Sequence, residues 1–387
     1  MVERRLNKSS STRASLGMYC RWLCSLLLAL LAHTTISTQT TSNDDAAQPA
    51  FRKCWDVRAE VLPEPGIAAD DSQGYIALQD GKVVGVDLSS GEIAWTAETG
   101  GKIASELVVS NGRVFFVALP RNQSSGLRST LRALSTKTGL SIWNLQLPTA
   151  AKYYLSSDNG GLTVISDAGA LWMLDGVEGR IRWHSTASGA ISALPRISDG
   201  RLLLAVEKKR VEEFSLEDGK RVALAEADGV PAFVGAGKSS AAVYSDERGN
   251  VHSIKMNGGK NWKFRAGGRV VYIRAVGDNV LLGSADNFVY FMNVEYGNLL
   301  WKRRLPGRIA SGGIVGNDLA AFTVIGERSA FILDLEKGRI VDRVVLSDDD
   351  AFLLTPIRAN GMYLLAATAS GISAFSASCK NQKSGQQ

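Results

Sequence analysis

The chain of 387 residues is 45% hydrophobic and 21% charged, a balance that supports a folded core and excludes disorder over the whole length. Its three histidines and four cysteines form no Cys-x-x-Cys-His sequence and no close ligand cluster, so covalent haem attachment and a structural zinc site lack ligands. Much of the formal net charge of +6 lies at the start, because residues 1–37 hold five Lys and Arg against a single Glu.

Residues 1–37 have the pattern of an export signal, in which a basic segment precedes an uncharged, apolar run at 22–32. That run is too short to span a bilayer. Neither Cys20 nor Cys24 follows the Leu-Ala-Gly run of a lipidation site. We therefore predict an exported protein, periplasmic or extracellular, whose membrane association is indirect or through an uncleaved leader.

Three further regions follow the leader. Residues 38–51 are rich in Thr, Ser, Asn, Asp and Gln without periodicity, which predicts a flexible linker. Residues 52–378 carry the folded domain, and residues 379–387 form a C-terminal tail.

An internal repeat decides the fold. A glycine is followed four residues later by a tryptophan at 91–95, 139–143, 179–183, 258–262 and 297–301. Two degenerate copies have Ala223 and Asp342 in place of the tryptophan. With these copies included, the anchors recur with a period of about 40 residues, the range of known repeat architectures.

Each unit has the composition of short strands. Alternating runs rich in β-branched and aromatic residues, such as 113–118 and 280–283, are separated by Gly, Asn and Asp. A polar residue four positions before each glycine predicts a tight turn, because its side chain can accept turn amides and the glycine can adopt positive φ. Four short strands in about 40 residues predict a propeller blade, whose apolar faces are buried only by stacking on neighbours.

The ends of the chain complete the number of blades. Trp55 lies one period before Trp95 and marks an outer strand without partners of its own, whereas 351–358, 361–367 and 371–377 predict three strands without an outer strand. We predict an all-β, eight-bladed β-propeller of four-stranded antiparallel blades, closed by the N-terminal strand joining the C-terminal blade.

Two sets of residues are expected to hold this ring together. Cys54 and Cys379 lie next to the strands that would meet, so they are disulfide candidates, with two free thiols as the alternative. The bond would close a loop of about 325 residues and stabilise the fold by on the order of 5 kcal/mol. The tryptophans expected to dock between blades are Trp55, Trp95, Trp143, Trp183, Trp262 and Trp301.

The repeated Asp-x-x-x-Gly-x-x-x-Trp, as in 87–95 and 175–183, resembles the tryptophan-docking repeat of PQQ-like, quinoprotein-type propellers. The resemblance covers residues 52–378. Within this family, the BamB-type propellers of the outer-membrane β-barrel assembly machinery are most similar in size and blade count. The resemblance implies a non-catalytic, protein-binding scaffold of the bacterial cell envelope. Propellers of the BamB type are anchored to the membrane by a lipidated cysteine. This leader differs from theirs, because neither of its cysteines follows a lipidation sequence.

Quinoprotein dehydrogenases of the same fold bind PQQ with a calcium ion, an aspartate base and an adjacent cysteine pair. A PQQ-binding or other small-ligand-binding propeller is therefore one alternative function. This sequence has no adjacent cysteines and no calcium-binding loop, and Asp348 to Asp350 have the character of a solvated turn. His184 and His252 lie beside or inside predicted strands, without a nucleophile elbow. We predict no enzyme activity and no catalytic, cofactor-binding or metal-binding residue.

One charge pattern is a candidate for partner binding. Lys260 precedes seven basic residues on two successive outer strands and the turns after them, namely Lys263, Arg265, Arg269, Lys302, Arg303, Arg304 and Arg308. Adjacent blades would gather these cations on one sector of the rim, as a dock for an acidic protein or an added strand. The alternative is that the charges only keep exposed edge strands from pairing. We expect a monomer and no nucleic-acid partner; a secreted or surface adhesion module is a further alternative function.

Overall fold

The computed structural model describes residues between Phe51 and Cys379. The described ranges are 51–60, 66–120, 128–149, 151–158, 160–207, 209–236, 241–255, 262–346, 353–359, 361–368 and 371–379. The chain divides into two units, Met1–Ala46 and Ala47–Gln387, and all described residues belong to the second. The predicted export signal, most of the linker and tail, Lys260, and Asp348 to Asp350 lie outside the described residues.

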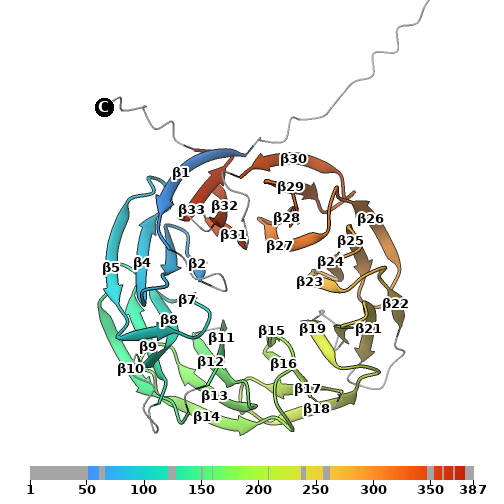
Figure 1. Cartoon of the computed structure of the whole chain (residues 1–387). Helices are drawn as coiled ribbons and strands as arrows, with labels where there is room; N and C mark the ends of the chain where they lie inside the picture. The colour runs from blue at the N-terminus through green and yellow to red at the C-terminus, as the bar shows by residue number, and fades with distance from the viewer. Residues whose placement is uncertain are drawn as a thin grey trace, which may run out of the picture. The chain divides into compact units, whose positions relative to one another are not determined.

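Eight antiparallel sheets follow one another around a ring, and each sheet is one blade (Figure 1). Blade 1 contains β2 (Ile67–Ala69), β3 (Gln73–Ala77), β4 (Lys82–Asp87) and β5 (Ile93–Glu98). Blade 2 contains β6 (Gly101–Ile103), β7 (Val108–Ser110), β8 (Arg113–Pro120), β9 (Thr130–Ser135) and β10 (Ser141–Gln146). Blade 3 contains β11 (Tyr153–Asp158), β12 (Gly161–Ser166), β13 (Ala170–Asp175) and β14 (Ile181–Thr186). Blade 4 contains β15 (Arg196–Ser198), β16 (Arg201–Val206), β17 (Arg210–Ser215) and β18 (Arg221–Glu226).

The second half of the ring repeats this arrangement. Blade 5 contains β19 (Pro231–Ala236), β20 (Ala241–Asp246), β21 (Asn250–Lys255) and β22 (Lys263–Arg265). Blade 6 contains β23 (Val270–Val276), β24 (Asn279–Ser284), β25 (Phe288–Asn293) and β26 (Leu299–Arg304). Blade 7 contains β27 (Ile309–Val315), β28 (Leu319–Val324), β29 (Ser329–Asp334) and β30 (Ile340–Val345). Blade 8 contains β31 (Leu353–Ala359), β32 (Gly361–Thr368), β33 (Gly371–Ser376) and β1 (Arg52–Arg58).

The composite blade 8 confirms the predicted closure. Strand β1, from the start of the described chain, pairs antiparallel with β33, from its end, and Trp55 lies opposite Ala374. Figure 1 shows β1 and β33 side by side in this sheet. The eight-bladed propeller predicted from the repeat is therefore confirmed.

Blade 2 differs from the four-strand expectation because its inner strand is interrupted. Strands β6 and β7 both pair with β8, with Ile103 opposite Ala118 and Val108 opposite Phe115. The intervening segment bulges out of the ladder, and the Ser105 hydroxyl accepts a hydrogen bond from Val117 N at 2.8 Å. The bulge satisfies a backbone group that the interrupted ladder would leave unpaired.

The core lies between the blades. Eight clusters of buried residues each draw on two neighbouring blades, so there is one cluster for every seam of the ring. Outer strands such as β14 and β26 instead alternate between exposed and half-buried residues. Burial is therefore a property of seams, as expected for units that stack face to face.

The outer strand carries a repeated bulge. In blade 1, Gly85 lies opposite Trp95 and Val86 opposite Ile93, so Ala94 is an extra residue in the ladder. The same register shift occurs in seven of the blades as described. In β1 the extra residue is Cys54, because Lys53 pairs with Phe375 and Trp55 with Ala374. A bulge bends a strand locally and changes the direction of a side chain. In β1 the bulged residue is the cysteine that bonds to Cys379, just after β33 of the same blade.

Candidate functional sites on the rim and in the channel

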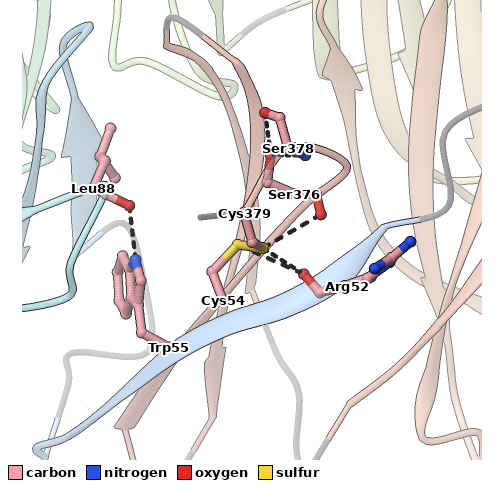
Figure 2. The surroundings of a disulfide bond; sticks show 7 residues. All are labelled: Arg52, Cys54, Trp55, Leu88, Ser376, Ser378 and Cys379. Carbon is pink, nitrogen blue, oxygen red and sulfur yellow. Dashed lines mark hydrogen bonds between the residues drawn. A yellow bond between two sulfur atoms is a disulfide. The ribbon is translucent and has the colours of Figure 1, made fainter. Parts of the chain in front are cut away.

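The six tryptophans of the repeat bridge neighbouring blades. Each indole N–H donates to a backbone carbonyl of the next blade, as Trp55 does to Leu88 at 2.7 Å (Figure 2). The remaining pairs are Trp95 with Thr136 at 2.7 Å, Trp143 with Gly176 at 3.4 Å, Trp183 with Leu216 at 2.9 Å, Trp262 with Val294 at 2.7 Å and Trp301 with Leu335 at 2.9 Å. The buried polar edge of each indole is thereby satisfied across a seam.

The turn glycine of each receiving blade provides the space for the indole. At Gly139, φ is 68°, and a Cβ added there would lie 2.5 Å from the Trp95 ring. Before such a glycine, the Asp of the repeat binds turn amides, as Asp87 accepts from Ser89 N at 2.8 Å and Ser90 N at 2.9 Å. The motif Asp-x-x-x-Gly-x-x-x-Trp therefore encodes a turn that receives one indole and a strand that presents the next.

The segment that closes the ring contacts three blades. Cys54 forms a disulfide with Cys379 across 325 residues, with a Cα–Cα distance of 5.4 Å (Figure 2). Trp55 reaches blade 1, and Phe51 N donates to the Asp342 carboxylate of blade 7 at 2.6 Å. Asp342 occupies the anchor position where other blades have tryptophan, so the seam between blades 7 and 8 uses a charged acceptor instead.

The seam between blades 4 and 5 also lacks an indole. Ala223 stands at the anchor position of β18. On the blade 5 side, the buried His252 ring stacks on Tyr244 with centroids 4.8 Å apart, and its Nδ1 lies 3.4 Å from the Asp228 carboxylate. Burial, followed by the positive charge of Lys263, lowers the pKa of His252 below 6.5. The histidine is therefore part of a seam, whereas His184 is exposed on β14.

The seven described cations of the predicted patch, here called the basic sector, lie on blades 5 and 6 and in the loops that leave them. Strands β22 and β26 are successive outer strands of the ring (Figure 1). Arg269 and Arg308 occupy equivalent loop positions, since their backbone carbonyls accept from Ala285 N and Ile325 N, both at 2.8 Å. All but Arg303 are exposed.

The basic sector gathers the largest group of cations without carboxylate partners on the described outer strands and the loops that follow them. None of its seven side chains forms an ion pair with a described residue, although Arg265 contacts the Asn250 amide oxygen at 3.4 Å. Several cations on other outer strands have carboxylate partners, as in Arg182 with Asp175 at 2.6 Å and Arg343 with Glu327 at 2.7 Å, whereas Arg52 and Arg58 on β1 form no ion pair with a described residue. Arg303 is set apart from the other six, because its Nε donates to Gly338 O of blade 7 at 2.6 Å and so belongs to a seam.

A second candidate site is a cavity of about 530 Å³ lined by inner-strand residues of blades 2, 3, 4 and 6. Its ionisable lining residues are Glu106, Asp158, Arg196 and Arg274. None of the residues that line this cavity was predicted as a site residue from the sequence. The available signal was the presence of arginine in a predicted first strand, because the first strand of every blade faces the centre of the ring.

The described residues contain no group of three or more His, Cys, Asp or Glu side chains placed to hold a metal ion. In that same part of the chain, no helix has the length and apolar character needed to cross a bilayer.

Comparisons with known proteins agree with this architecture. The family described as "Outer membrane protein assembly factor BamB" matches residues 45–158 and 128–247. The outer membrane protein assembly factor BamB of Yersinia pestis is 23% identical over 316 residues, which cover 80% of this chain and 70% of that protein.

Solved structures show the same fold. BamB from Moraxella catarrhalis superimposes with a TM-score of 0.61 and 19% identity, covering 87% of this chain and 99% of its own. The computationally designed Ika8 protein superimposes with a TM-score of 0.69 and 11% identity, covering 84% of this chain and 98% of its own. The similarity expected from the tryptophan repeat is thus confirmed.

Proposed function

The chain belongs to the family described as outer membrane protein assembly factor BamB, and on this premise we propose that it is a non-catalytic, protein-binding scaffold of the bacterial cell envelope. The name of the Yersinia relative describes a factor that assembles outer membrane proteins, which supports a role in binding other proteins. The export pattern of residues 1–37 supports a location outside the cytoplasm.

The unpaired charge of the basic sector is the observation that carries the proposed mode of binding. Six exposed cations on two neighbouring blades, none of them in an ion pair with a described residue, create a local positive field, whereas Arg182 and Arg343 on other outer strands are paired with carboxylates. The Lys302 ammonium also lies over the Phe288 ring, 5.4 Å from its centroid, which helps to hold it in place. We propose that an acidic segment of a partner docks here.

Rigid display is the mechanism in this proposal. The strands that carry the cations are held by seams on both sides, so docking orders few additional groups. Exposed charges of this kind act mainly on the rate of encounter and on selection of the partner. Partner binding should therefore weaken as salt concentration rises.

A charge-reversal pair tests this mode of binding. The Arg304→Glu, Arg308→Glu variant changes two exposed cations without a described side-chain contact and leaves Arg303 in its seam. The matched control is Arg128→Glu, Lys137→Glu in blade 2, four blades away. Pull-down from envelope extracts should recover a discrete protein with the wild type and the control variant, and much less of it with the sector variant. Equal recovery with both variants would eliminate the basic sector as the dock.

Two simple experiments address the other parts of the proposal. Titration with pyrroloquinoline quinone should give no calcium-dependent rise in melting temperature, whereas a saturable rise that requires calcium would favour the quinoprotein alternative. Cell fractionation should place the protein in the envelope, and recovery in the cytoplasm would contradict the proposed location.

A further inference from the structure

The central cavity has the size of a small-molecule site. Its volume of about 530 Å³ falls within the range typical of pockets that bind drug-sized ligands. Residues of four blades form its wall, so the cavity exists only when the ring is closed.

Two guanidinium groups meet in this cavity. Arg196 begins β15 in blade 4, and Arg274 lies in β23 of blade 6. They are close enough that the charge of Arg274, after burial, lowers the pKa of Arg196. Two like charges held at close range in a polar cavity have a destabilising interaction that an anion between them would relieve.

Arg196 also has unused hydrogen-bonding capacity. Its Nε is buried and has no hydrogen-bond partner among the described residues, and its Nη1 reaches only Pro195 O, at 3.4 Å. Arg274 is exposed and forms no ion pair with a described residue. A buried donor without a partner carries a desolvation cost that a ligand can remove by accepting a hydrogen bond from it.

Neither arginine forms an ion pair with a described carboxylate. Glu106 and Asp158 line the same cavity, but each already has an interaction of its own. The charge of Glu106 acts on Arg196 without forming an ion pair with it. Burial raises the pKa of Tyr272 to about 12, so its hydroxyl stays neutral near both guanidinium groups. Additional polar atoms come from Ser156, Ser157 and Ser198, which line the wall.

We infer that the central cavity is a binding site for a small oxyanion, a molecule bearing a carboxylate or a phosphate group, held between Arg196 and Arg274. Guanidinium groups present planar arrays of donors that match carboxylate and phosphate oxygens. The serine hydroxyls of the wall would contact the polar remainder of the ligand. This site is separate from the basic sector, which lies on the outer strands and loops of blades 5 and 6.

Isothermal titration of the purified protein with sodium phosphate and with succinate, at low ionic strength, tests the inference. We expect saturable one-to-one binding of at least one anion, with a dissociation constant in the millimolar range or below. Succinamide, which is neutral, should not bind. Binding of succinate alone would identify a carboxylate ligand, and binding of phosphate alone a phosphate ligand; either result supports the site.

Substitution of the arginines locates the binding. Arg274→Gln changes an exposed side chain, so the fold should be kept. Arg196→Gln changes the other arginine of the cavity. Each substitution should weaken anion binding about tenfold or more. Arg128→Gln on blade 2 is the matched control and should bind like the wild type. The Arg304→Glu, Arg308→Glu variant should also bind like the wild type, which separates this test from that of the proposed function. No saturable binding of either anion, or binding unaffected by Arg274→Gln, would overturn the inference.

Discussion

Six seams of the propeller are joined by a tryptophan, and two are not. The indole seams share one neutral contact, in which a ring packs on a turn glycine and donates to a carbonyl, as Trp95 does with Gly139 and Thr136. The seam of blades 7 and 8 has the Asp342 carboxylate at this position, and the seam of blades 4 and 5 has Ala223 with His252 nearby.

This difference shows that one fold can be closed by two kinds of contact. At the anchor position, each indole seam relies on burial and a neutral hydrogen bond, so pH should affect that contact little. The two seams without an indole have the Asp342 carboxylate or the His252–Asp228 pair instead, whereas the disulfide joins two segments of blade 8. Indole seams also contain ionisable groups, as where the buried Glu212 carboxylate accepts from Ser188 N at 3.2 Å between blades 3 and 4, so this difference is limited to the contact at the anchor position.

The largest effect is expected from the disulfide of blade 8. The double substitution Cys54→Ser, Cys379→Ser opens a loop of 325 residues and should lower the free energy of unfolding by on the order of 5 kcal/mol in the chain-entropy model. Thermal or urea unfolding measures the loss. Reductant should destabilise the wild type and leave the serine variant unchanged; equal stability of the two oxidised proteins would contradict the role of the bond.

Removal of one indole should weaken a seam by an amount close to this. Trp95 is 8% exposed, and Trp95→Ala should cost about 3–5 kcal/mol, because it leaves a cavity and removes the donor to Thr136 O. Trp172→Ala is the control, since Trp172 lies half-buried on β13 outside the anchor position. Urea unfolding of the two variants measures the difference, and an equal or larger loss from Trp172→Ala would contradict the special role of the anchor.

A pair of glycines separates indole contact from backbone strain. Gly139 and Gly200 have nearly equal φ values of 68° and 72°, but only Gly139 faces an indole, and nothing lies within 4 Å of a Cβ added at Gly200. Gly200→Ala should cost about 1 kcal/mol from the left-handed backbone alone. Gly139→Ala should cost about 2–4 kcal/mol, because the methyl group also displaces Trp95. Equal melting temperatures of the two variants would rule out tight indole packing.

The charged seam of blades 7 and 8 should respond more weakly. Asp342→Ala removes the acceptor of Phe51 N and should cost about 1 kcal/mol, since the carboxylate is only half-buried. Asp342→Asn retains an acceptor oxygen and is the matched control, with a smaller expected loss. Urea unfolding compares the variants. A neutral effect of Asp342→Ala would show that the contact between Phe51 N and Asp342 does not contribute to closure of the ring.

The smallest effect concerns the acid response of the seam of blades 4 and 5. Because the folded-state pKa of His252 is lowered by burial and by Lys263, the unfolded chain binds its proton more readily. The contribution of His252 to stability is present above about pH 6.5 and is lost as pH falls from there through the lowered folded pKa. Melting temperatures measured from pH 7.5 to 5 should fall less for His252→Gln than for the wild type. Parallel pH profiles would contradict this assignment.

Several features could not be predicted from the repeat. The interrupted inner strand of blade 2 depends on Ser105 bonding to Val117 N, a local contact that leaves no mark on the period. Arg303 has the same sequence character as its neighbours in the basic sector, yet its guanidinium is used within a seam because β26 directs it toward Gly338. The direction of an outer-strand side chain depends on the bulge before the anchor as well as on strand alternation.

The sequence by itself determined the period, the eight blades, the closing strand and the indole positions, because these depend on short-range patterns that recur at fixed spacing. The tertiary structure decided which charges meet at the centre. Arg196 and Arg274 come from blades that are not adjacent, and their proximity and the burial of the Arg196 side chain arise only when the ring is closed. The repeat therefore encodes the contacts between neighbours, whereas the chemistry of the channel depends on distances across the ring that no local pattern contains.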